Sequence, residues 1–509
     1  MIDMKKVVLT ADRTLMTDYN GFTPLGHFAC LPNRLVPNFT LRYLLPRLDK
    51  GIATYALRRL EASLLDNDFD VTILRPHEIS KIKKIRPKAV GISTVDPLTT
   101  KPHPWTLSNI FGGGEAVTEN EFHSLLSSIN KYREQNRFKI IIGGPGASEF
   151  KRTDKYHDLF DTYTTGAAEA SIELFQKAVD GDPLPREHTG SAVSVHKLSI
   201  IKGAARCGHV QITQGCPRGC QFCAPTLLPW ISFPKERILK EIDVNLHSSV
   251  QQVSLISEDV LLYGSKDVEV NHRAIIDLMK DIEKRKERYD LKNVNISNVS
   301  IASTIKGKKT IHEMTDIMGF SEDCMVDTII GLETGSEKLI KRYMEGKARP
   351  FDPNNWHDLA IDAIKILNDN YWYPICSMIS GLPGENEDDV IKTIDLVDDL
   401  KGNRLFYYIF YFVPMGKLEG CDFFTINEVT SRRWELFYIC WMETIRSLRD
   451  FIRSFENKLF KFVILRLMNE IEKDLKKYKN DPFGFRDAYA SVNLKGIRLV
   501  SFLAKRYIS

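Results

Sequence analysis

Three cysteines, Cys216, Cys220 and Cys223, stand four and three residues apart in the segment QGCPRGCQFCAP. Thiolates are preferred ligands of iron–sulfur clusters, and three at this spacing can reach three corners of one four-iron cube. The fourth iron then has no protein ligand and is open to a substrate. Zinc is the alternative, but it normally takes four ligands, and only Cys207 and His209 are nearby candidates. The segment therefore favours a cluster with one open iron.

The composition indicates an ordinary soluble globular protein. Of the 509 residues, 43% are hydrophobic and 27% charged, with 30 Gly and 22 Pro, which excludes disordered and collagen-like chains. The 70 Lys and Arg against 66 Asp and Glu leave a formal charge of +4. That is too small to indicate nucleic-acid binding, so no nucleic-acid partner is expected.

Neither a membrane segment nor a secretion signal is expected. The longest nearly apolar stretch, residues 405–415, is shorter than a membrane-spanning helix and predicts a buried strand. Residues 1–10 lack the apolar region and the cleavage site of a signal peptide. The chain is therefore expected in the cytoplasm, away from membranes, with its nine Cys reduced.

The first third of the chain alternates strand-like and helix-like segments, which predicts an α/β domain with a parallel sheet. Residues 54–65 predict a helix, and two glycine turns follow strands, GGPGAS at 143–148 and the turn at Gly166. Such turns cradle ligands at the carboxyl ends of doubly wound sheets, although tight turns alone also require Gly. The expected strands are 6–10, 71–75, 89–93 and 139–142. Residues 11–40 and 94–120 are expected to be long loops.

The middle of the chain repeats the strand–helix pattern six times and predicts a partial (β/α)6 barrel. The expected strands are 209–213, 253–257, 299–303, 326–331, 374–379 and 406–413. Beyond residue 425 the pattern becomes helical, and Trp434, Phe437, Tyr438 and Trp441 have the spacing of a buried helix face. We therefore expect domains at 1–195, 196–420 and 421–509.

The cysteine segment, with an aromatic at Phe222, resembles the signature of radical S-adenosylmethionine (SAM) enzymes. In that family three Cys bind a [4Fe-4S] cluster, and its open iron is chelated by the amino and carboxylate groups of SAM. An electron from the cluster cleaves SAM to a 5'-deoxyadenosyl radical. The resemblance implies that Cys216, Cys220 and Cys223 are the metal ligands, and that an external protein or chemical donor supplies the electron.

Downstream segments extend this resemblance. GLETGSE at 331–337 and MEGK at 344–347 are similar to the family's fourth-strand region, SGLPGE at 380–385 to the fifth-strand turn, and VPMG at 413–416 to the sixth-strand exit. SED at 257–259 stands where the family more often has Gly-Gly-Glu. The residues implied to contact SAM or the cluster are Phe222, Glu258, Glu333, Ser380 and Gly381.

The N-terminal region resembles the Rossmann-like cobalamin-binding domain of the B12-dependent branch of this family. GAAE at 166–169 keeps only the ends of the branch's usual Gly-Glu-Gly-Glu, and no Asp-x-His-x-x-Gly follows the first strand, so a histidine ligand to cobalt is not expected. The resemblance covers about residues 1–420. The residues it implies for cobalamin binding are Thr94, Val95, Gly143, Gly144, Pro145, Ser148, Gly166 and Glu169.

The resemblance implies a methyltransferase that uses the cluster, SAM and cobalamin to methylate an unactivated carbon. The domain order is similar to that of archaeal enzymes that C-methylate a glutamine of methyl-coenzyme M reductase, so a protein or peptide substrate is expected, and a monomer. A small molecule or lipid is the alternative substrate, and non-methylating chemistry stays open. A methylthiotransferase needs three more N-terminal Cys, but only Cys30 precedes Cys207. A cobalamin carrier would not need the three Cys.

Several other residues have a functional and a structural interpretation. His27, His103 and His209 are able to approach cobalt or substrate, or to be ordinary buried histidines. The tyrosines at 371, 373, 407, 408 and 411 are able to line a cleft or to pack in a core. The sequence assigns no catalytic acid or base.

Overall fold

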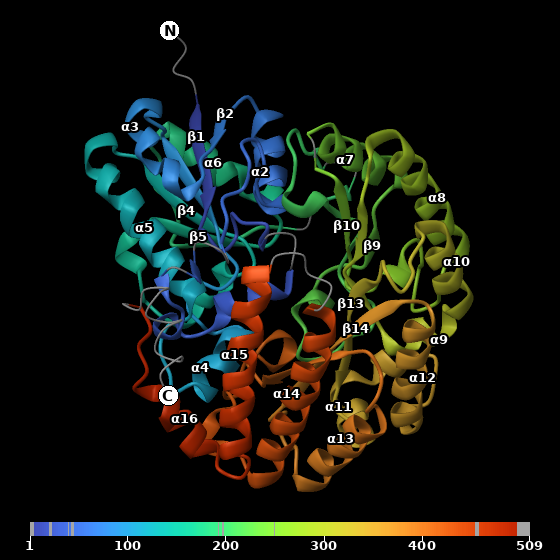
Figure 1. Cartoon of the computed structure of the whole chain (residues 1–509). Helices are drawn as coiled ribbons and strands as arrows, with labels where there is room; N and C mark the ends of the chain where they lie inside the picture. Colours follow the sequence, from blue (N-terminus) through green and yellow to red (C-terminus); the bar gives the residue numbers. More distant parts are fainter. Residues whose placement is uncertain are drawn as a thin grey trace.

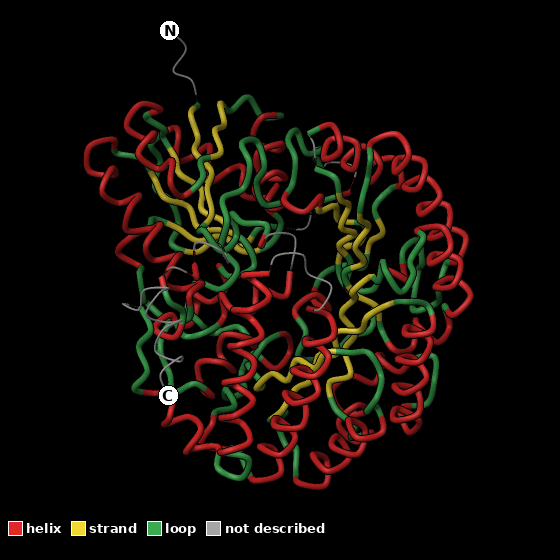
Figure 2. The backbone as a smooth tube through the Cα atoms, in the orientation of Figure 1, coloured by secondary structure: helices red, strands yellow, loops and turns green. Residues whose placement is uncertain are grey.

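The computed structural model describes residues 5–19, 23–38, 40–41, 45–191, 193–195, 198–248, 250–452 and 458–495. Within this part, an N-terminal sheet with its helices lies beside a second, curved set of parallel strands and helices (Figure 1). The C-terminal helices lie below and between the two. Figure 2 shows the strands of the two sheets as separate groups. No helix of the described residues is both long and apolar enough to cross a membrane.

The N-terminal sheet has six parallel strands in the order β2-β1-β3-β4-β5-β6. The chain order reverses between β1 and β3, which is the flavodoxin-like form of the doubly wound fold, and ligands bind such folds at this point. The predicted strands are confirmed within one or two residues because each is a short apolar run. The strands are β1 (Lys6–Ala11), β2 (Asp70–Ile73), β3 (Ala89–Ser93), β4 (Lys139–Gly143), β5 (Thr162–Thr165) and β6 (Glu187–Thr189).

The predicted helix at 54–65 is confirmed as α2 (Tyr55–Leu65), and the Thr54 side chain caps it by accepting a hydrogen bond from the Leu57 amide. Two long loops were expected in this region, and the second expectation is wrong. Residues 102–110 form α4 (Pro102–Ile110), because prolines at the first and third positions of a helix lose no hydrogen bond. The other helices here are α3 (Ile82–Ile85), α5 (Val117–Asn136) and α6 (Ile172–Asp180).

The first expected loop, 11–40, contains only short 3-10 helices among its described residues, η2 (Thr23–Cys30) and η3 (Asn33–Leu35). Further short 3-10 helices follow the strands of the N-terminal sheet. They are η4 (Pro76–Lys81), η5 (Ala147–Arg152), η6 (His157–Leu159) and η7 (Ala168–Ser171).

The second set of strands forms six parallel positions in chain order. Two sheets, β11-β10-β7 and β12-β13-β14-β15, meet at Ser297, whose carbonyl accepts from the Ile329 amide at 2.9 Å and whose amide donates to Leu255 at 3.2 Å. The arrangement agrees with a partial (β/α)6 barrel. The strands are β7 (His209–Gln211), β10 (Gln252–Ile256), β11 (Asn293–Ile296), β12 (Asn298–Val299), β13 (Val326–Glu333), β14 (Trp372–Ser380) and β15 (Phe406–Tyr411).

The expected strand at 299–303 is wrong beyond Val299. Ser300 accepts a hydrogen bond from the Ser303 amide and so starts a helix instead. A short antiparallel pair, β8 (Thr213–Gln214) with β9 (Ile231–Ser232), flanks the cysteine segment. The helices are α7 (Lys235–His247), α8 (His272–Tyr289), α9 (Ile301–Lys306), α10 (Lys308–Met318), α11 (Glu337–Ala348), α12 (Trp356–Asp369) and α13 (Glu387–Asp399).

Helices from both ends of the chain cover the edge strand β15. The Tyr407 amide donates to Thr444 Oγ1 at 2.9 Å, and the Tyr411 amide donates to Thr106 Oγ1 of α4 at 2.7 Å. Covering an edge strand prevents it from pairing with another chain. The C-terminal helices are α14 (Ser431–Ile452), α15 (Lys458–Lys477) and α16 (Pro482–Ala490). Trp434 and Phe437 of α14 are buried, as expected for a core face.

Candidate functional site

The cysteine loop begins at Gly215, directly after β8. Gly215 has φ +76°, and a Cβ there would lie 2.4 Å from the Pro229 carbonyl oxygen, so the turn requires glycine. Cys220 is only 6% exposed, and Cys216 and Cys223 are half-buried. The three predicted ligands therefore share one tight loop, with their thiols shielded from solvent.

Two distant segments hold this loop through its backbone. The Gln221 amide donates to the Tyr343 carbonyl and its side chain donates to the Arg342 carbonyl, both at 2.8 Å. The Gln221 carbonyl accepts from the Lys417 amide at 2.7 Å. These partners belong to α11 and to the turn after β15, so the barrel's fourth and sixth strand exits position the cysteines.

Glycines allow these close approaches. A Cβ on Gly346 would lie 2.0 Å from the Arg218 carbonyl oxygen, and a Cβ on Gly416 would lie 2.6 Å from that of Gln221. Both distances are far below van der Waals contact. The glycines of the MEGK and VPMG segments thus serve the cysteine loop as supports.

A buried ion pair anchors the loop to the second barrel strand. Arg218 lies 3.4 Å from the Asp259 carboxylate, and Ser303 Oγ donates to the same carboxylate at 2.9 Å. Both charged residues are buried. Glu258 is exposed, and its charge helps to raise the pKa of the Cys223 thiol, after burial itself. In the SED segment, therefore, Asp259 is structural and Glu258 is the acidic group available beside the cysteines.

Glu333 and Lys347 form a second buried ion pair beside the cysteines. Strand β13 has an irregularity between Gly331 and Glu333, and Glu333 has φ +60°, which turns its side chain out of the regular alternation. A Cβ on Gly331 would lie 2.2 Å from both the Glu333 carboxylate and Lys347 Nζ. Only glycine fits at position 331, because the ion pair of Glu333 and Lys347 occupies the space that a side chain would need.

Lys347 also faces the cysteine loop. Burial lowers the pKa of Lys347, but the Glu333 carboxylate and the Cys220 thiol outweigh it, so that its pKa is raised overall. Its ammonium lies 6.0 Å from the centre of the Phe222 ring. A fixed cation at this place favours an anionic group bound to the cysteines. Lys347 is the last residue of the MEGK segment, and the sequence alone assigns it no role.

The donor set fits an iron–sulfur cluster better than a single metal ion. Among the described residues, no three His, Cys, Asp or Glu side chains lie close enough together to hold one ion. A cluster distributes its thiolate bonds over separate irons, so its ligands stand further apart than those of zinc. Three thiols, no fourth ligand and an adjacent cation are what a cluster with one open iron needs.

Ser380 and Gly381 lie at the end of β14 and are already engaged. The Gly381 amide donates to the Glu385 carboxylate at 2.7 Å, and a Cβ on Gly381 would lie 2.1 Å from the Phe424 ring. Ser380 is buried, and its carbonyl accepts from the Phe412 amide at 2.9 Å. Their predicted contact with SAM stays a prediction.

The loops after β3 and β4 meet at the carboxyl edge of the N-terminal sheet, beside the switch point between β1 and β3, and their junction, called the crevice below, is lined by glycine. The Thr94 amide donates to the Gly143 carbonyl at 2.9 Å, and the Gly146 amide donates to the Thr94 carbonyl at 3.0 Å. Gly144 has φ +93°, and a Cβ there would lie 2.5 Å from the Thr94 carbonyl oxygen. The loops after β3 and β4 are thus in backbone contact.

Two features of this crevice fit a large bound cofactor. Thr94 Oγ1 is buried without a hydrogen-bond partner among the described residues. The neighbouring Val95 side chain is 43% exposed, although it is apolar. An unsatisfied hydroxyl and an exposed apolar group side by side suit a ligand with polar and apolar parts. Pro145 lies in the same turn, and Ser148 is half-buried in η5.

The second glycine turn lies against the barrel. Glu169 is buried in an ion pair with Arg59 of α2, and Arg59 also donates to Gln211 of β7 at 2.7 Å. A Cβ on Gly166 would lie 2.4 Å from the Gly190 carbonyl oxygen. The structure therefore engages Glu169 in a bridge between sheet and barrel, and its predicted contact with cobalamin stays a prediction.

A pair of acidic side chains lies beneath the crevice. Glu149 accepts from Thr100 Oγ1 at 2.6 Å and lies 3.5 Å from Lys101 Nζ. Burial, and next the nearby Asp96 carboxylate, raise the pKa of Glu149, and burial likewise raises the pKa of Asp96. Ionising both carboxyl groups, those of Glu149 and Asp96, therefore costs free energy at neutral pH.

This pair predicts a pH-dependent stability. The folded state keeps a proton that the unfolded state loses above about pH 4, so the free energy of unfolding falls as pH rises from there through the raised pKa. We expect Glu149→Gln to remove this decline, worth about 1.4 kcal/mol for each unit of pKa shift. Thermal unfolding midpoints of both proteins at about pH 5 and pH 8 measure it. An equal decline in the two proteins would contradict the interpretation.

The structure brings two of the three singled-out histidines together. His27 Nδ1 and His103 Nδ1 are 2.7 Å apart, and the Tyr408 ring lies 4.0 Å from His27. Burial lowers the pKa of His103 to about 4, and burial, and next the nearby His103, lower the pKa of His27 well below its usual value, so both are neutral at pH 7. His209 lies in β7, and burial lowers its pKa to about 3.

One apolar residue of a central barrel strand is exposed. Ile329, in the middle of β13, is 44% exposed, which is unusual for an apolar residue on a central strand. Tyr408 is half-buried, whereas Tyr407 and Tyr411 are buried. Trp372 and Tyr373 are also buried, in keeping with packing, and Tyr371 is exposed.

The sequence of the barrel matches a known superfamily. Residues 210–397, which include the three cysteines and the segments SED, GLETGSE, MEGK and SGLPGE but not VPMG, match the radical SAM superfamily. The chain carries a radical SAM domain. The expected radical SAM domain is thereby confirmed, and the roles of the individual cysteines stay predictions.

Curated relatives match the chain at low identity. A tRNA-2-methylthio-N(6)-dimethylallyladenosine synthase of Desulfosudis oleivorans is 20% identical over 273 residues, covering 52% of this chain and 53% of the relative. The chain thus spans about half the length of that relative. An uncharacterized protein of Methanocaldococcus jannaschii is 28% identical over 364 residues, covering 59% and 68%. A ribosomal protein uS12 methylthiotransferase of Dictyoglomus thermophilum is 21% identical, covering 68% and 77%.

One solved fold is similar over most of the chain. It is TsrM, a radical SAM methyltransferase of Kitasatospora setae, solved with cobalamin and a [4Fe-4S] cluster. The TM-score is 0.55 at 12% identity, with 82% of this chain and 77% of TsrM covered. The radical SAM match covers only residues 210–397. The similarity in fold to TsrM covers 82% of the chain and therefore extends beyond the barrel.

Proposed function

We propose that this protein is a cobalamin-dependent radical SAM methyltransferase that methylates an unactivated carbon. The observation that carries the proposal is the presence, in one chain with a TsrM-like fold, of a three-cysteine loop and a glycine-walled crevice. Within the described residues, both lie at strand ends where ligands bind such folds.

Different residues would hold the cluster and cobalamin. Cys216, Cys220 and Cys223 would hold the cluster, with Lys347 offsetting its negative charge. The loops that meet at Thr94 and Gly144 would hold cobalamin. When bound, the cluster with SAM supplies a radical, and cobalamin supplies a methyl group. The chain holds these groups in fixed positions and keeps water from them.

The substrate class is a protein or peptide in this proposal. The exposed Ile329 of β13 and the half-buried Tyr408 of β15 would offer apolar contact to a substrate side chain. A peptide carrying the glutamine of methyl-coenzyme M reductase is the first to test, because of the resemblance in domain order. A small molecule or lipid is the alternative. The proposal also includes an external electron donor and a cytoplasmic monomer that binds neither nucleic acid nor membranes.

A methylthiotransferase is the second candidate, because one relative is named a methylthiotransferase and another is named as the synthase of a methylthio-modified tRNA base. The resemblance to that family implies a second cluster held by three further N-terminal Cys. Here only Cys30 precedes Cys207 in the whole sequence. The chain therefore lacks ligands for such a cluster, and we favour methyl transfer.

The test is a measurement of bound metals followed by an isotope assay. Protein supplied anaerobically with iron, sulfide and cobalamin is expected to hold about four irons and one cobalt per chain. With SAM labelled in its methyl group and the candidate peptide, the label should appear on carbon. Iron without cobalt would refute the cobalamin assignment, and a second cluster's iron would favour the methylthiotransferase.

A further inference from the structure

Two histidines from the N-terminal part of the chain meet a tyrosine of the barrel. His27 belongs to η2, in the segment after β1, and His103 belongs to α4, in the segment after β3. Their Nδ1 atoms are 2.7 Å apart, and the centre of the Tyr408 ring lies 4.0 Å from that of His27 and 5.7 Å from that of His103. Strands β1 and β3 flank the switch point of the N-terminal sheet, where ligands bind such folds. The histidine pair therefore lies where the two domains meet.

The pair lies on the same side of the barrel sheet as the surroundings of the cysteines. Tyr408 of β15 is paired with Ser377 of β14, so both side chains point to one face of the sheet, with backbones about 4.8 Å apart. Ser377 Oγ lies 3.5 Å from the Glu333 carboxylate, and Glu333 forms the ion pair with Lys347 beside the cysteine loop. A row of adjacent side chains thus leads from the histidine pair toward the predicted cluster.

The two imidazoles are neutral, and this determines what they offer to a ligand. Burial lowers the pKa of His103 to about 4, and burial, and next His103, lower the pKa of His27 well below its usual value. Each neutral imidazole carries one proton, and the hydrogen bond between the two Nδ1 atoms uses one of these two protons. The other proton is then on one Nε2 atom, while the second Nε2 atom keeps its lone pair. The pair presents one donor and one acceptor, whichever histidine donates at Nδ1.

Both Nε2 atoms are open to a bound group. Within the described residues neither Nε2 atom makes a hydrogen bond, and both histidines are only half-buried. Neither atom is enclosed without a partner, so both are accessible. A metal ion is not the expected ligand, because the described residues contain no group of three potential metal ligands. An Nδ1 separation of 2.7 Å is also the distance of a hydrogen bond.

We propose that the His27–His103 pair binds the primary carboxamide of a substrate side chain. The inference rests on the proposed function, and it names the group by which the substrate is recognised. A primary carboxamide carries an N–H donor and a C=O acceptor on the same side, so it would satisfy both Nε2 atoms at once. A backbone peptide group points its N–H and C=O in opposite directions and fits less well. Tyr408 and Ile329, on the same face of the sheet, would cover the apolar part of the side chain.

Charged groups fit the pair less well than a carboxamide. An ammonium group only donates, so it would leave the donating Nε2 unpaired, and a carboxylate only accepts, so it would leave the accepting Nε2 unpaired. One acidic side chain, Asp327 of β13, lies on this face and forms no ion pair within the described part of the chain. Burial raises the pKa of Asp327, which favours its neutral form and weakens its attraction for a cation.

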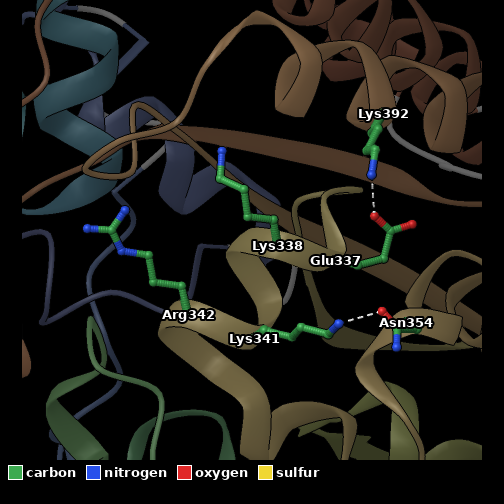
Figure 3. Close-up of a pocket in the computed structure, with 6 residues that line it drawn as sticks. All are labelled: Glu337, Lys338, Lys341, Arg342, Asn354 and Lys392. Atoms are coloured by element: carbon green, nitrogen blue, oxygen red, sulfur yellow. Dashed lines mark hydrogen bonds and ion pairs between the residues drawn. The ribbon is translucent and has the colours of Figure 1, made fainter.

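A hollow on the outside of the barrel offers a different chemistry. It has a volume of about 560 Å³ and is lined by α11, α13 and η12 (Pro353–Asn355) (Figure 3). Lys392 pairs there with Glu337 at 2.7 Å, and Lys341 donates to the Asn354 side chain at 2.5 Å. Its lining is mostly charged and includes no residue of a barrel strand, so we do not expect the substrate carboxamide to bind there.

The experiment observes the histidine nitrogens directly by NMR. Holoprotein with isotope-labelled histidine is titrated with propionamide, which is the side-chain fragment of glutamine. Before the titration, one Nε2 of the pair should be protonated and the other not. Propionamide should shift both Nε2 resonances, which are assigned by their loss in His27→Asn and His103→Asn. The resonances of His77, an exposed histidine of η4, should not move.

Propionate and propylammonium are the matched probes, because they have the size of propionamide but only accept or only donate. Neither should shift both Nε2 resonances of the pair. No shift with propionamide, or equal shifts with either charged probe, would overturn the inference.

The methylation assay separates this inference from the proposed function. His27→Asn/His103→Asn should raise the KM for the glutamine peptide about tenfold or more and leave kcat nearly unchanged, because two hydrogen bonds to the substrate are lost. An unchanged KM would contradict the inference. If propionamide shifts the pair but the wild-type protein methylates no carbon, the proposed function fails and the carboxamide site stands.

Discussion

Replacing Cys220 by alanine is expected to abolish the cluster and SAM cleavage together. Cys220 is the most buried of the three thiols, and without it only two cysteines of the loop would remain to hold the cluster. We expect the iron content to fall from about four per chain to near zero, with no 5'-deoxyadenosine formed. Cobalamin binding should remain, because the crevice lies on the other sheet. Iron analysis and chromatography of the reaction measure both.

Cys207→Ala is the matched control. Cys207 is a buried cysteine close in sequence and would be a ligand only if the site held zinc. It should keep its iron and its SAM cleavage. Retained cleavage in Cys220→Ala would refute the cluster assignment, and loss of bound metal in Cys207→Ala would favour the zinc alternative.

Gly144→Ala is expected to abolish cobalamin binding while leaving the cluster. The added Cβ would lie 2.5 Å from the Thr94 carbonyl oxygen, at a φ of +93° that costs of order 1–3 kcal/mol for a residue with a side chain. The loops after β3 and β4 would have to separate, which deforms the crevice. Cobalt per chain should fall at least tenfold, and iron per chain should stay the same.

Gly181→Ala separates backbone strain from the collision. Gly181 has φ +83°, and a Cβ there would meet no atom within 4 Å. This variant should lose similar backbone stability but bind cobalamin as the wild type does. If Gly144→Ala binds as much cobalt as Gly181→Ala, the crevice is not the cobalamin site.

The strands were predictable because each is a continuous apolar run, and such a run is a local property of the chain. The errors fall where local signals compete. Prolines 102 and 104 were interpreted as loop residues, but they begin α4, where proline is tolerated. At 299–303 an apolar stretch suited a strand or a helix, and the cap formed by Ser300 decided for the helix.

The candidate site also combines features that are local in the sequence with features that join distant residues. The three cysteines and the glycine turn could be found in the sequence because each is a contiguous segment whose residue types determine its chemistry. The ion pairs of Lys347 with Glu333 and of Arg218 with Asp259 could not, because they join residues from different strand exits. The bridge from Glu169 through Arg59 to Gln211 likewise joins three elements.

By itself, therefore, the sequence determined the α/β class, the positions of most strands and the radical SAM domain, and it predicted the three cysteines as metal ligands. Only the tertiary structure decided that α4 covers the edge of the barrel and which charges pair around the cysteines. The physical reason is that these features depend on the packing of elements distant in the chain. The packing of helices and strands determines which side chains come into contact, and these contacts cannot be predicted from a local pattern of residues.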